Sequence, residues 1–505
     1  MRKFISFLAF VLSVTFCKAQ PHNNDGDTLF SSSFIHEIRL NFSQPSFWDS
    51  LTAYYTQDRY MMASIVFDGY FLDSIGVKLK GNSSYNYPSV KKSMKVGLNE
   101  FVSGKDIDDI NKFNLNNCFK DPTFLREKMM LDFLNLYQYP APRCTYARVY
   151  LNNQYWGLYT MVEEVNKDFL KGWYNFKNGN LFKGDPSGDL KWLGTNPALY
   201  YPKYELKTNE TLNDWSDLVR FINVINNTPA QNFYDSLESY LNTHEFIYEW
   251  AISNLFVNLD SYLGTGHNYY IYHDSLSGKF RYITWDVNEA FGNFNYTMTP
   301  TQLKNLSAFW VSNPPTNRPL INNMLSNSFY RQKYANTLCD LLGYNFSPWA
   351  LYPKIDSLAN RIRPYVYADP NKFFSNQHFE DNLTNDIIVP NQPGGGNFPG
   401  LKSLISVRRA ALANELASYG CILGLGENDS EEEITVFPNP GSEFFVLSPK
   451  PLYKIELTDI AGKIIMDWNP GGLTQFNINP QGISTGVYFL IFNGNKTQKV
   501  IYHID

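Results

Sequence analysis

The spacing of apolar residues changes near Leu212, and this change limits the folds that the chain can adopt. Before it, short segments such as His36–Phe42 and Tyr70–Lys80 alternate apolar and polar residues, which is typical of strands with one buried face. After it, apolar residues recur every three to four positions, as in the segment Leu218–Ile225, which is typical of helices. Strands early and helices late predict an α+β domain.

Length and terminal composition divide the chain further. A single hydrophobic core stops growing near ~250–300 residues, so a chain of 505 residues needs more than one domain. Arg2 and Lys3 precede an apolar run that ends shortly before Ala19, which is the pattern of a secretory signal peptide. We therefore expect a signal peptide at 1–19, a polar leader at 20–34, the α+β domain at 35–420, an acidic linker at 421–433 and a small all-β sandwich at 434–505.

Charge and composition exclude several classes of protein. Lys and Arg number 43 against 48 Asp and Glu, so the chain lacks the basic excess expected of a nucleic-acid-binding protein. Aromatic residues make up 16% of the chain, which excludes a disordered chain, a coiled coil and a collagen-like fibre. No stretch after the signal peptide has the ~18 or more apolar residues of a membrane-spanning helix. We expect an exported protein without a transmembrane helix.

Four cysteines remain once the signal peptide is removed, namely Cys118, Cys144, Cys339 and Cys421. Four thiols allow three pairings, and the sequence does not choose among them. Their wide spacing argues against a zinc site, whose ligands usually come in close pairs. One disulfide, two disulfides and buried free thiols all stay open.

Acidic and amide side chains are concentrated between Asn258 and Glu289. Asp260 follows a predicted helix, Asp286 follows a predicted strand, and a hairpin between them returns the chain. Both carboxylates could therefore face one cleft, where with Asn288 they would offer the hard oxygen ligands that Mg²⁺ and a nucleotide phosphate require. The alternative is that the two aspartates only cap the ends of a helix and a turn.

Lysines and small residues mark the early strands. Lys78 and Lys80 alternate on one strand before Gly81–Ser84, and Lys95 lies on the next strand. A turn of small residues backed by lysines could hold phosphates through backbone N–H groups and positive charge. Alternating lysines are equally typical of an exposed edge strand, where they prevent aggregation.

Taken together, these segments resemble the CotH (spore-coat protein H) kinase family over residues 35–420. The motifs, in the family's order, are GVKLKGNSS at Gly76–Ser84 with Lys91–Ser93, FLREK at Phe124–Lys128, NQYWGLYTMVE at Asn153–Glu163, NLFK at Asn180–Lys183, and the block from Asp260 through His267–Tyr270 to Asp286. The resemblance implies a two-lobed, atypical protein-kinase-like domain. It also implies that this domain phosphorylates serines of secreted or surface proteins with ATP and Mg²⁺.

The resemblance assigns roles to individual residues. Asp260 matches the family's catalytic aspartate, which orients and deprotonates the acceptor hydroxyl. Asp286 matches the metal-binding aspartate of a Trp-Asp-x-Asp motif, whose second acid is replaced here by Asn288. An amide oxygen can still bind Mg²⁺, although the site loses one negative charge. The remaining motif matches assign nucleotide contacts to Lys80, Lys95, Glu163 and Lys183.

The C-terminal segment resembles a type IX secretion sorting domain (type A). The motifs are VFPNP at Val436–Pro440, LTDIAGK at Leu457–Lys463, GVYF at Gly486–Phe489 and a basic stretch at Lys496–Lys499. This resemblance implies a Bacteroidetes-type cell, contact with the outer-membrane secretion machinery, and a location outside the cell or on its outer surface. The alternative is an adhesive β-sandwich that stays attached to the chain.

We expect a secreted or cell-surface kinase that transfers the γ-phosphoryl group of ATP to Ser or Thr of exported proteins. ATP is scarce outside a cell, so two alternatives stay open. One is a non-catalytic surface module that binds glycan or protein through aromatic side chains. The other is a metal-dependent phosphoester hydrolase that uses the same carboxylates.

Overall fold

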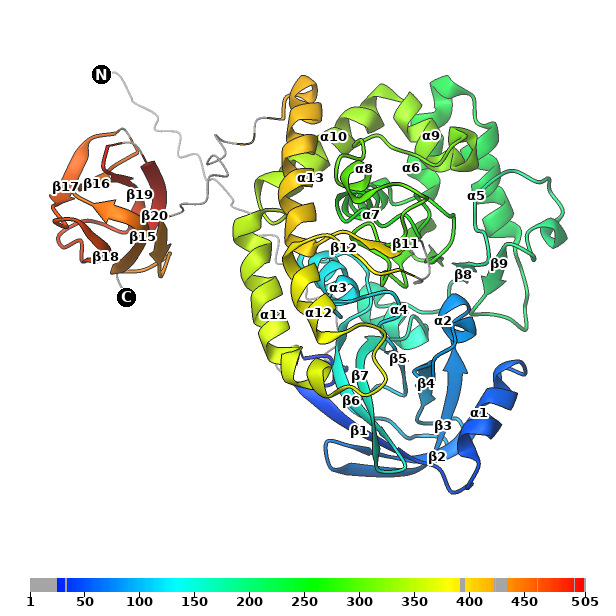
Figure 1. Cartoon of the computed structure of the whole chain (residues 1–505). Coiled ribbons are helices and arrows are strands. Elements are labelled where there is room, and N and C mark those ends of the chain that lie inside the picture. The colour runs from blue at the N-terminus through cyan, green and yellow to red at the C-terminus, as the bar shows by residue number, and fades with distance from the viewer. Residues whose placement is uncertain are drawn as a thin grey trace, which may run out of the picture. The chain divides into compact units, whose positions relative to one another are not determined.

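The computed structural model describes residues 25–31, 34–390, 396–421, 423, 434–460, 462–494 and 496–503. The chain divides into two compact units, with the boundary between Leu423 and Gly424, and both are drawn in Figure 1. The predicted signal peptide and most of the predicted acidic linker lie outside the described residues. Among the residues described, no helix is both long and apolar enough to cross a membrane.

Seven strands of the first unit form a closed barrel, in the order β1-β2-β3-β4-β5-β7-β6 (Figure 1). Apolar side chains that alternate along the strands fill its interior; Ile38, Leu40 and Val77, for example, are fully buried. Neighbouring strands are antiparallel except β1 and β6, which run parallel and close the barrel. The strands are β1 (Ile35–Asn41), β2 (Met61–Phe67), β3 (Tyr70–Lys80), β4 (Ser93–Gly97), β5 (Lys112–Asn116), β6 (Cys144–Leu151) and β7 (Gln154–Glu163).

The closed barrel corrects one expectation from the sequence. The expected two-lobed, kinase-like domain is wrong for this chain, because the early strands close on themselves and the chain up to Leu423 groups as one compact unit. Closure depends on the parallel pairing of β1 with β6, in which Ile35 lies opposite Tyr146. A pairing between segments so far apart leaves no trace in local hydrophobic alternation, which reports only that one face of each strand is buried.

Most helices of the first unit share a second hydrophobic cluster, separate from the barrel interior, whereas the first two helices pack with the barrel cluster through Leu51 and Tyr85. Figure 1 shows most of them on one side of the barrel. The helices of the unit are α1 (Phe47–Tyr55), α2 (Ser83–Asn86), α3 (Arg126–Leu136), α4 (Lys167–Tyr174), α5 (Ser216–Asn227), α6 (Phe233–Tyr240), α7 (Thr243–Leu255), α8 (Pro300–Lys304), α9 (Pro319–Ser326), α10 (Ser328–Gly343), α11 (Pro348–Ala368), α12 (Asn376–Thr384) and α13 (Leu401–Leu416).

A second, four-stranded sheet has the order β11-β10-β8-β9. Its strands are β8 (Leu181–Gly184), β9 (Tyr204–Leu206), β10 (Tyr269–Asp274) and β11 (Lys279–Thr284), and a short pair, β12 (Ile387–Ile388) with β13 (Asn397–Phe398), lies elsewhere in the unit. Helix α7 packs against β11. The residues that follow α7 and those that follow β11 are therefore positioned by two elements that pack against each other.

A buried ion pair fastens the C-terminal end of α11 to the barrel. Lys91 Nζ lies 2.6 Å from Asp369 Oδ2, both side chains are fully buried, and the backbone N–H of Leu158 on β7 donates to the same carboxylate oxygen. Gly157 leaves room for this contact, because a Cβ at that position would lie 2.6 Å from the Asp369 carboxylate. Lys91, part of the basic sequence pattern, therefore has a structural partner whose loss would leave a buried charge unpaired.

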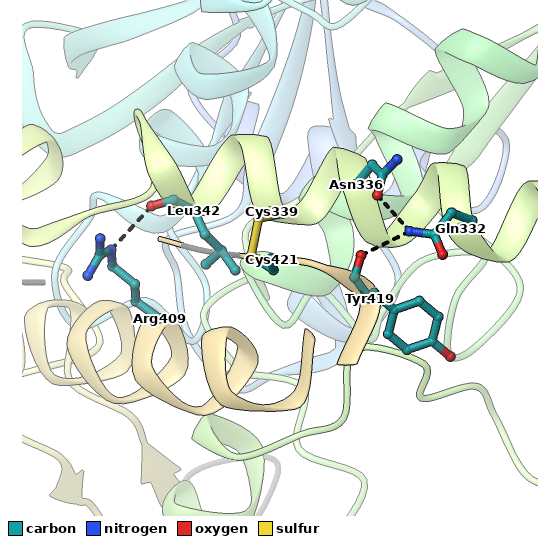
Figure 2. Close-up of a disulfide and its surroundings, with 7 residues drawn as sticks. All are labelled: Gln332, Asn336, Cys339, Leu342, Arg409, Tyr419 and Cys421. Atoms are coloured by element: carbon teal, nitrogen blue, oxygen red, sulfur yellow. Dashed lines mark hydrogen bonds between the residues drawn. A yellow bond between two sulfur atoms is a disulfide. The ribbon is translucent and has the colours of Figure 1, made fainter. Parts of the chain in front are cut away.

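One disulfide answers the question of cysteine pairing that the sequence leaves open. Cys339 on α10 is bonded to Cys421, which follows α13 (Figure 2). The Gln332 side chain, also on α10, donates to the backbone carbonyl of Tyr419 at 3.1 Å beside it. The bond closes a loop with a sequence separation of 82, a constraint worth about 4.5 kcal/mol in the chain-entropy model. The other two thiols, Cys118 and Cys144, are buried and free.

The second unit is entirely β within the residues described, as the sequence predicts. A three-stranded sheet, β14-β15-β18, and a four-stranded sheet, β17-β16-β19-β20, enclose their own hydrophobic cluster, which includes Phe444, Leu457 and Leu490. The strands are β14 (Thr435–Phe437), β15 (Phe444–Leu452), β16 (Ile455–Thr458), β17 (Ile464–Trp468), β18 (Leu473–Ile478), β19 (Gly486–Phe492) and β20 (Lys496–Tyr502).

Candidate functional site

Asp260 lies in the loop between α7 and β10, and two neighbours hold its carboxylate. His267 Nε2 lies 2.7 Å from Oδ1, and Asn268 Nδ2 donates to Oδ2 at 3.0 Å. Because an ionised carboxylate only accepts hydrogen bonds, His267 must carry a hydrogen on Nε2. Burial alone would lower the pKa of His267, but the hydrogen bond to Asp260 and the charges of Asp260, Asp185 and Asp286 raise it. The carboxylate of Asp260 is therefore fixed in orientation.

Asp286 follows β11 and is the least satisfied carboxylate of the site. Its side chain is half-buried and, within the described residues, accepts no hydrogen bond and forms no close ion pair. Burial raises its pKa, and Asp260 acts in the same direction, whereas Lys80, Lys183 and His267 lower it. Its backbone is left-handed, with φ of 52°. A half-buried carboxylate of this kind, in reach of several cations, is suited to bind a cation or a ligand group.

Lys80, at the end of β3, lies beside Asp286 on the outer face of the barrel. Its Nζ donates to Asn114 Oδ1 at 3.0 Å and to Asn116 Oδ1 at 3.1 Å, and it lies 5.2 Å from the centre of the Trp285 ring. An ammonium group has three hydrogens, so one is left for an anion. Burial lowers the pKa of Lys80, while the charge of Asp286 opposes that shift.

A chain of hydrogen bonds extends from Lys80 to α3. Asn116 Nδ2 donates to Glu127 Oε1 at 2.8 Å. Burial raises the pKa of Glu127 to about 8, and Asp286 adds to the shift, whereas Lys80 opposes it. The first turn of α3 is thus coupled electrostatically to both Lys80 and Asp286.

The predicted residues Lys95 and Glu163 lie in different environments. Lys95 Nζ is 2.7 Å from Glu164 Oε1, and Asn114 Nδ2 donates to the other oxygen of Glu164 at 2.7 Å. Burial lowers the pKa of Lys95 to about 8. Glu163 instead forms an ion pair with Arg143 at 2.8 Å. Successive strand residues point to opposite faces, so it is Glu164, one position further on, that joins the lysines.

Lys183 reaches the same cluster from β8. It pairs with Asp185 at 2.5 Å, and it lies opposite Tyr270 of β10 in the sheet register. Burial alone would lower the pKa of Lys183, but Asp185 reverses the effect and raises it, and Asp286 contributes in the same direction. Lys183 is therefore one of the cations whose charge acts on Asp286.

Asn288 and Glu289 continue the turn after Asp286. Asn288 Nδ2 donates to the Phe119 carbonyl at 3.2 Å, which leaves its amide oxygen for another partner. Both oxygens of Glu289 accept from Lys120 Nζ at 2.9 Å. Burial raises the pKa of Glu289 to about 7, although Lys120 opposes the shift. The acid next to Asn288 is thus already bound to a lysine.

The described residues contain no group of three or more His, Cys, Asp or Glu side chains placed to hold a metal ion by themselves. Mg²⁺ usually binds through one or two protein oxygens, with waters and phosphate oxygens completing its shell. The unbonded carboxylate of Asp286 and the amide oxygen of Asn288 fit that smaller requirement. The arrangement is consistent with a metal that arrives with a phosphate ligand.

The structure thus gathers Asp260, Asp286, Lys80 and Lys183, while Lys95 joins through Glu164 and Glu163 lies apart. Sequence reasoning assigned no role to several partners of this cluster. Alternation within Lys112–Asn116 could have placed two amides beside the lysines, because they share a strand face. These unassigned partners are Asn114, Asn116, Glu127, Glu164, Asp185 and His267.

A family model described as CotH kinase protein matches residues 77–385, which is more than half of the chain. The chain belongs to the CotH kinase family. The match spans all the clustered side chains, from Lys80 on β3 to Asn288 after β11. A second model, the secretion system C-terminal sorting domain, matches residues 435–504.

Curated relatives of this CotH family chain come from a bacterium and a fungus. The inner spore coat protein H of Bacillus subtilis is 26% identical over 288 residues, which is 56% of this chain and 75% of that protein. Invasin CotH2 and invasin CotH3 of Rhizopus delemar are each 23% identical, over 62% and 64% of this chain. The alignments span only 56% and 57% of the two invasins.

The sorting domain indicates where this CotH family protein is found. Domains of this kind direct secretion and attachment to the outer surface, so the protein is exported and interacts with the secretion machinery. The second unit of the structure, which is all-β within the residues described, contains the matched residues 435–504.

Proposed function

We propose that the chain is a secreted kinase that transfers the γ-phosphoryl group of ATP to Ser or Thr hydroxyls of exported proteins. The observation that carries the proposal is the Asp286 carboxylate, which accepts no hydrogen bond from the described residues while the charges of Lys80 and Lys183 act on it. A carboxylate beside lysines is the arrangement that a metal–nucleotide complex requires. Membership of the CotH kinase family supports the same activity.

Asp286 and Asn288 would hold Mg²⁺ through a carboxylate and an amide oxygen. The ion would neutralise charge on the β- and γ-phosphate oxygens. Lys80 would give its remaining hydrogen to a phosphate oxygen, and Lys183 would add positive charge nearby. Positioning and charge neutralisation supply most of the catalysis in phosphoryl transfer.

Asp260 would act on the acceptor. Its carboxylate, held by His267 and Asn268, would orient the hydroxyl and take its proton. The acceptor oxygen forms a bond to the γ-phosphorus while the bond from that phosphorus to the bridging oxygen breaks, and ADP leaves.

Thermal-shift titration of the full chain with ATP, with and without Mg²⁺, tests the proposal. Asp286→Asn is the informative variant, because Asn removes the charge yet tolerates the left-handed backbone at this position. Ligand at ~100 times its dissociation constant should stabilise the protein by ~2.7 kcal/mol. We expect a Mg²⁺-dependent shift that Asp286→Asn abolishes and that Asp49→Asn, an exposed position in α1, retains.

The other outcomes distinguish the alternatives. A missing shift at millimolar ATP would favour a non-catalytic binding module. Nucleotide binding accompanied by release of inorganic phosphate from esters without any acceptor would favour a hydrolase. Asp260→Asn should keep nucleotide binding and lose transfer to peptide serines; transfer that persists would contradict the role of Asp260.

A further inference from the structure

A solvent-open pocket of about 390 Å³ lies between α3 and α11 of the first unit, two helices that run beside the barrel in Figure 1. None of its lining residues belongs to the cluster around Asp286. Its volume falls in the range of small-molecule sites in proteins, ~300–1,000 Å³. The pocket is therefore large enough to be a second site, independent of the proposed phosphoryl transfer.

The floor of this pocket is apolar. Met129 and Phe133 from α3 and Leu351 and Leu358 from α11 form it, and all four belong to the hydrophobic cluster of the unit. Pro353 lines the same pocket from within α11. These four side chains are only 1–9% exposed, so at ~25 cal/mol per Å² of apolar surface covered an apolar ligand body gains only a modest free energy from the floor.

The mouth of the pocket is positively charged. Lys354 and Arg361 line it together with Asp132, so the cations outnumber the acid. Asp132 already has a partner, because Lys128 Nζ lies 2.6 Å from its Oδ1. Lys354 is exposed and forms no hydrogen bond or close ion pair with the described residues, although its charge acts on Asp132.

We propose that this pocket binds an amphipathic carboxylate, a small molecule with one anionic head and an acyl or aryl body. The body would cover Met129, Phe133 and Leu351, and the head would pair with Lys354 at the mouth. A neutral ligand would form no ion pair with Lys354, and a cationic ligand would be repelled by its charge. Recognition therefore requires both the apolar floor and the charge at the mouth.

Decanoate is a suitable probe, and isothermal titration of the full chain below the micellar concentration measures its binding. Lys354→Glu reverses the charge at the mouth, and we expect binding about threefold to tenfold weaker, since an ion pair at an exposed position is weak and the reversed charge adds repulsion. Ser357→Trp places bulk in the pocket from an exposed position and should abolish binding. Lys167→Glu, at an exposed lysine of α4, is the matched control and should bind like the unaltered chain.

Decylamine, with the same chain and the opposite charge, is the ligand control and should not bind. The proposal would be overturned by decanoate failing to saturate a site on the unaltered chain, or by decylamine binding equally well. Equal affinity in Ser357→Trp would likewise overturn it, since the ligand would then lie elsewhere. Thermal unfolding of each variant shows that it is folded. No nucleotide is needed, so the result does not depend on kinase activity.

Discussion

The carboxylate of Asp260 has a donor at each oxygen, and both donors come from a loop next to it in sequence. His267 and Asn268 lie seven and eight residues further on, so the loop that carries the acid also orients it. Asn268 has a positive φ of 58°, a conformation that Asn tolerates better than most residues. At the residue scale, the site depends on side chains that hold other side chains in place.

Replacing His267 tests whether this orientation matters for transfer. His267→Phe removes the donor to Asp260, and we expect kcat to fall about tenfold or more, since a hydrogen bond to a charged group is worth ~1.5–3 kcal/mol. The KM for ATP should change less than kcat, because the side chains proposed to hold Mg²⁺ and the phosphates remain in place and lose only the charge of His267. His267→Gln can still donate and should lose less. Steady-state kinetics on a serine peptide measures both; an equal loss in the two variants would argue against the orienting role.

Glu163 and Glu164 show how a single position decides a residue's surroundings. Glu163 pairs with Arg143, and Glu164 pairs with Lys95. Both acids are visible in the sequence, but alternation assigns a face only once the strand's end and register are known. The motif resemblance therefore located the segment but did not show which acid meets the lysines.

At the scale of elements, α7 and β11 are held together by a buried acid. Glu249 on α7 is fully buried, and Thr284 on β11 donates to its Oε2, while its Oε1 has no hydrogen-bond partner in the described part of the chain. Burial raises the pKa of Glu249 well above its usual value, and Glu245 adds to the shift. Burial thus favours the protonated, neutral form of this side chain, although the hydrogen bond from Thr284 acts in the opposite direction.

A raised carboxyl pKa in the folded state makes stability fall as pH increases. The contribution of Glu249 is fully present below its unfolded pKa of ~4.3 and is lost as pH rises toward the folded value. Glu249→Gln keeps an acceptor for Thr284 and cannot ionise. We therefore expect its unfolding midpoint, relative to the unaltered chain, to increase between pH 5 and pH 8.

Urea unfolding at several pH values measures this difference. Glu210→Gln, at an exposed glutamate, is the matched control and should show no pH-dependent difference. A constant difference between Glu249→Gln and the unaltered chain across that range would contradict a raised pKa. Each unit by which folding raises the pKa of Glu249 corresponds to ~1.4 kcal/mol in the free energy of unfolding. Even a small rise in this pKa therefore gives a measurable change in stability.

At the scale of the whole molecule, the chain consists of two units with separate hydrophobic clusters. The first contains the barrel and the helices, and the second contains only strands within the described residues. The family match and the sorting-domain match fall in different units. Export and the proposed chemistry are therefore assigned to separate parts of the chain.

Because the two units share no hydrophobic cluster, we expect them to unfold independently of each other. We expect calorimetry of the full chain to show two transitions, and deletion of residues 434–505 to remove one of them. The remaining transition should move by less than about 2 °C, because the deletion takes no side chain from the larger core. A single cooperative transition for the full chain would contradict independent units.

Local sequence patterns were sufficient to predict several strands and helices of this protein and its family. Alternation at Tyr70–Lys80 marked a strand, the spacing at Leu218–Ile225 marked a helix, and the motifs around Asp260 and Asp286 indicated the family. Such signals survive in sequence because each depends on residues that are close together along the chain.

Tertiary structure alone decided the rest. It closed the barrel through β1 and β6, chose Cys339 and Cys421 as the disulfide, and brought Glu164 to Lys95. Each of these is a contact between segments that are distant in sequence. Hydrophobic periodicity records which face of an element is buried but not against what, and only the folded chain specifies the partner.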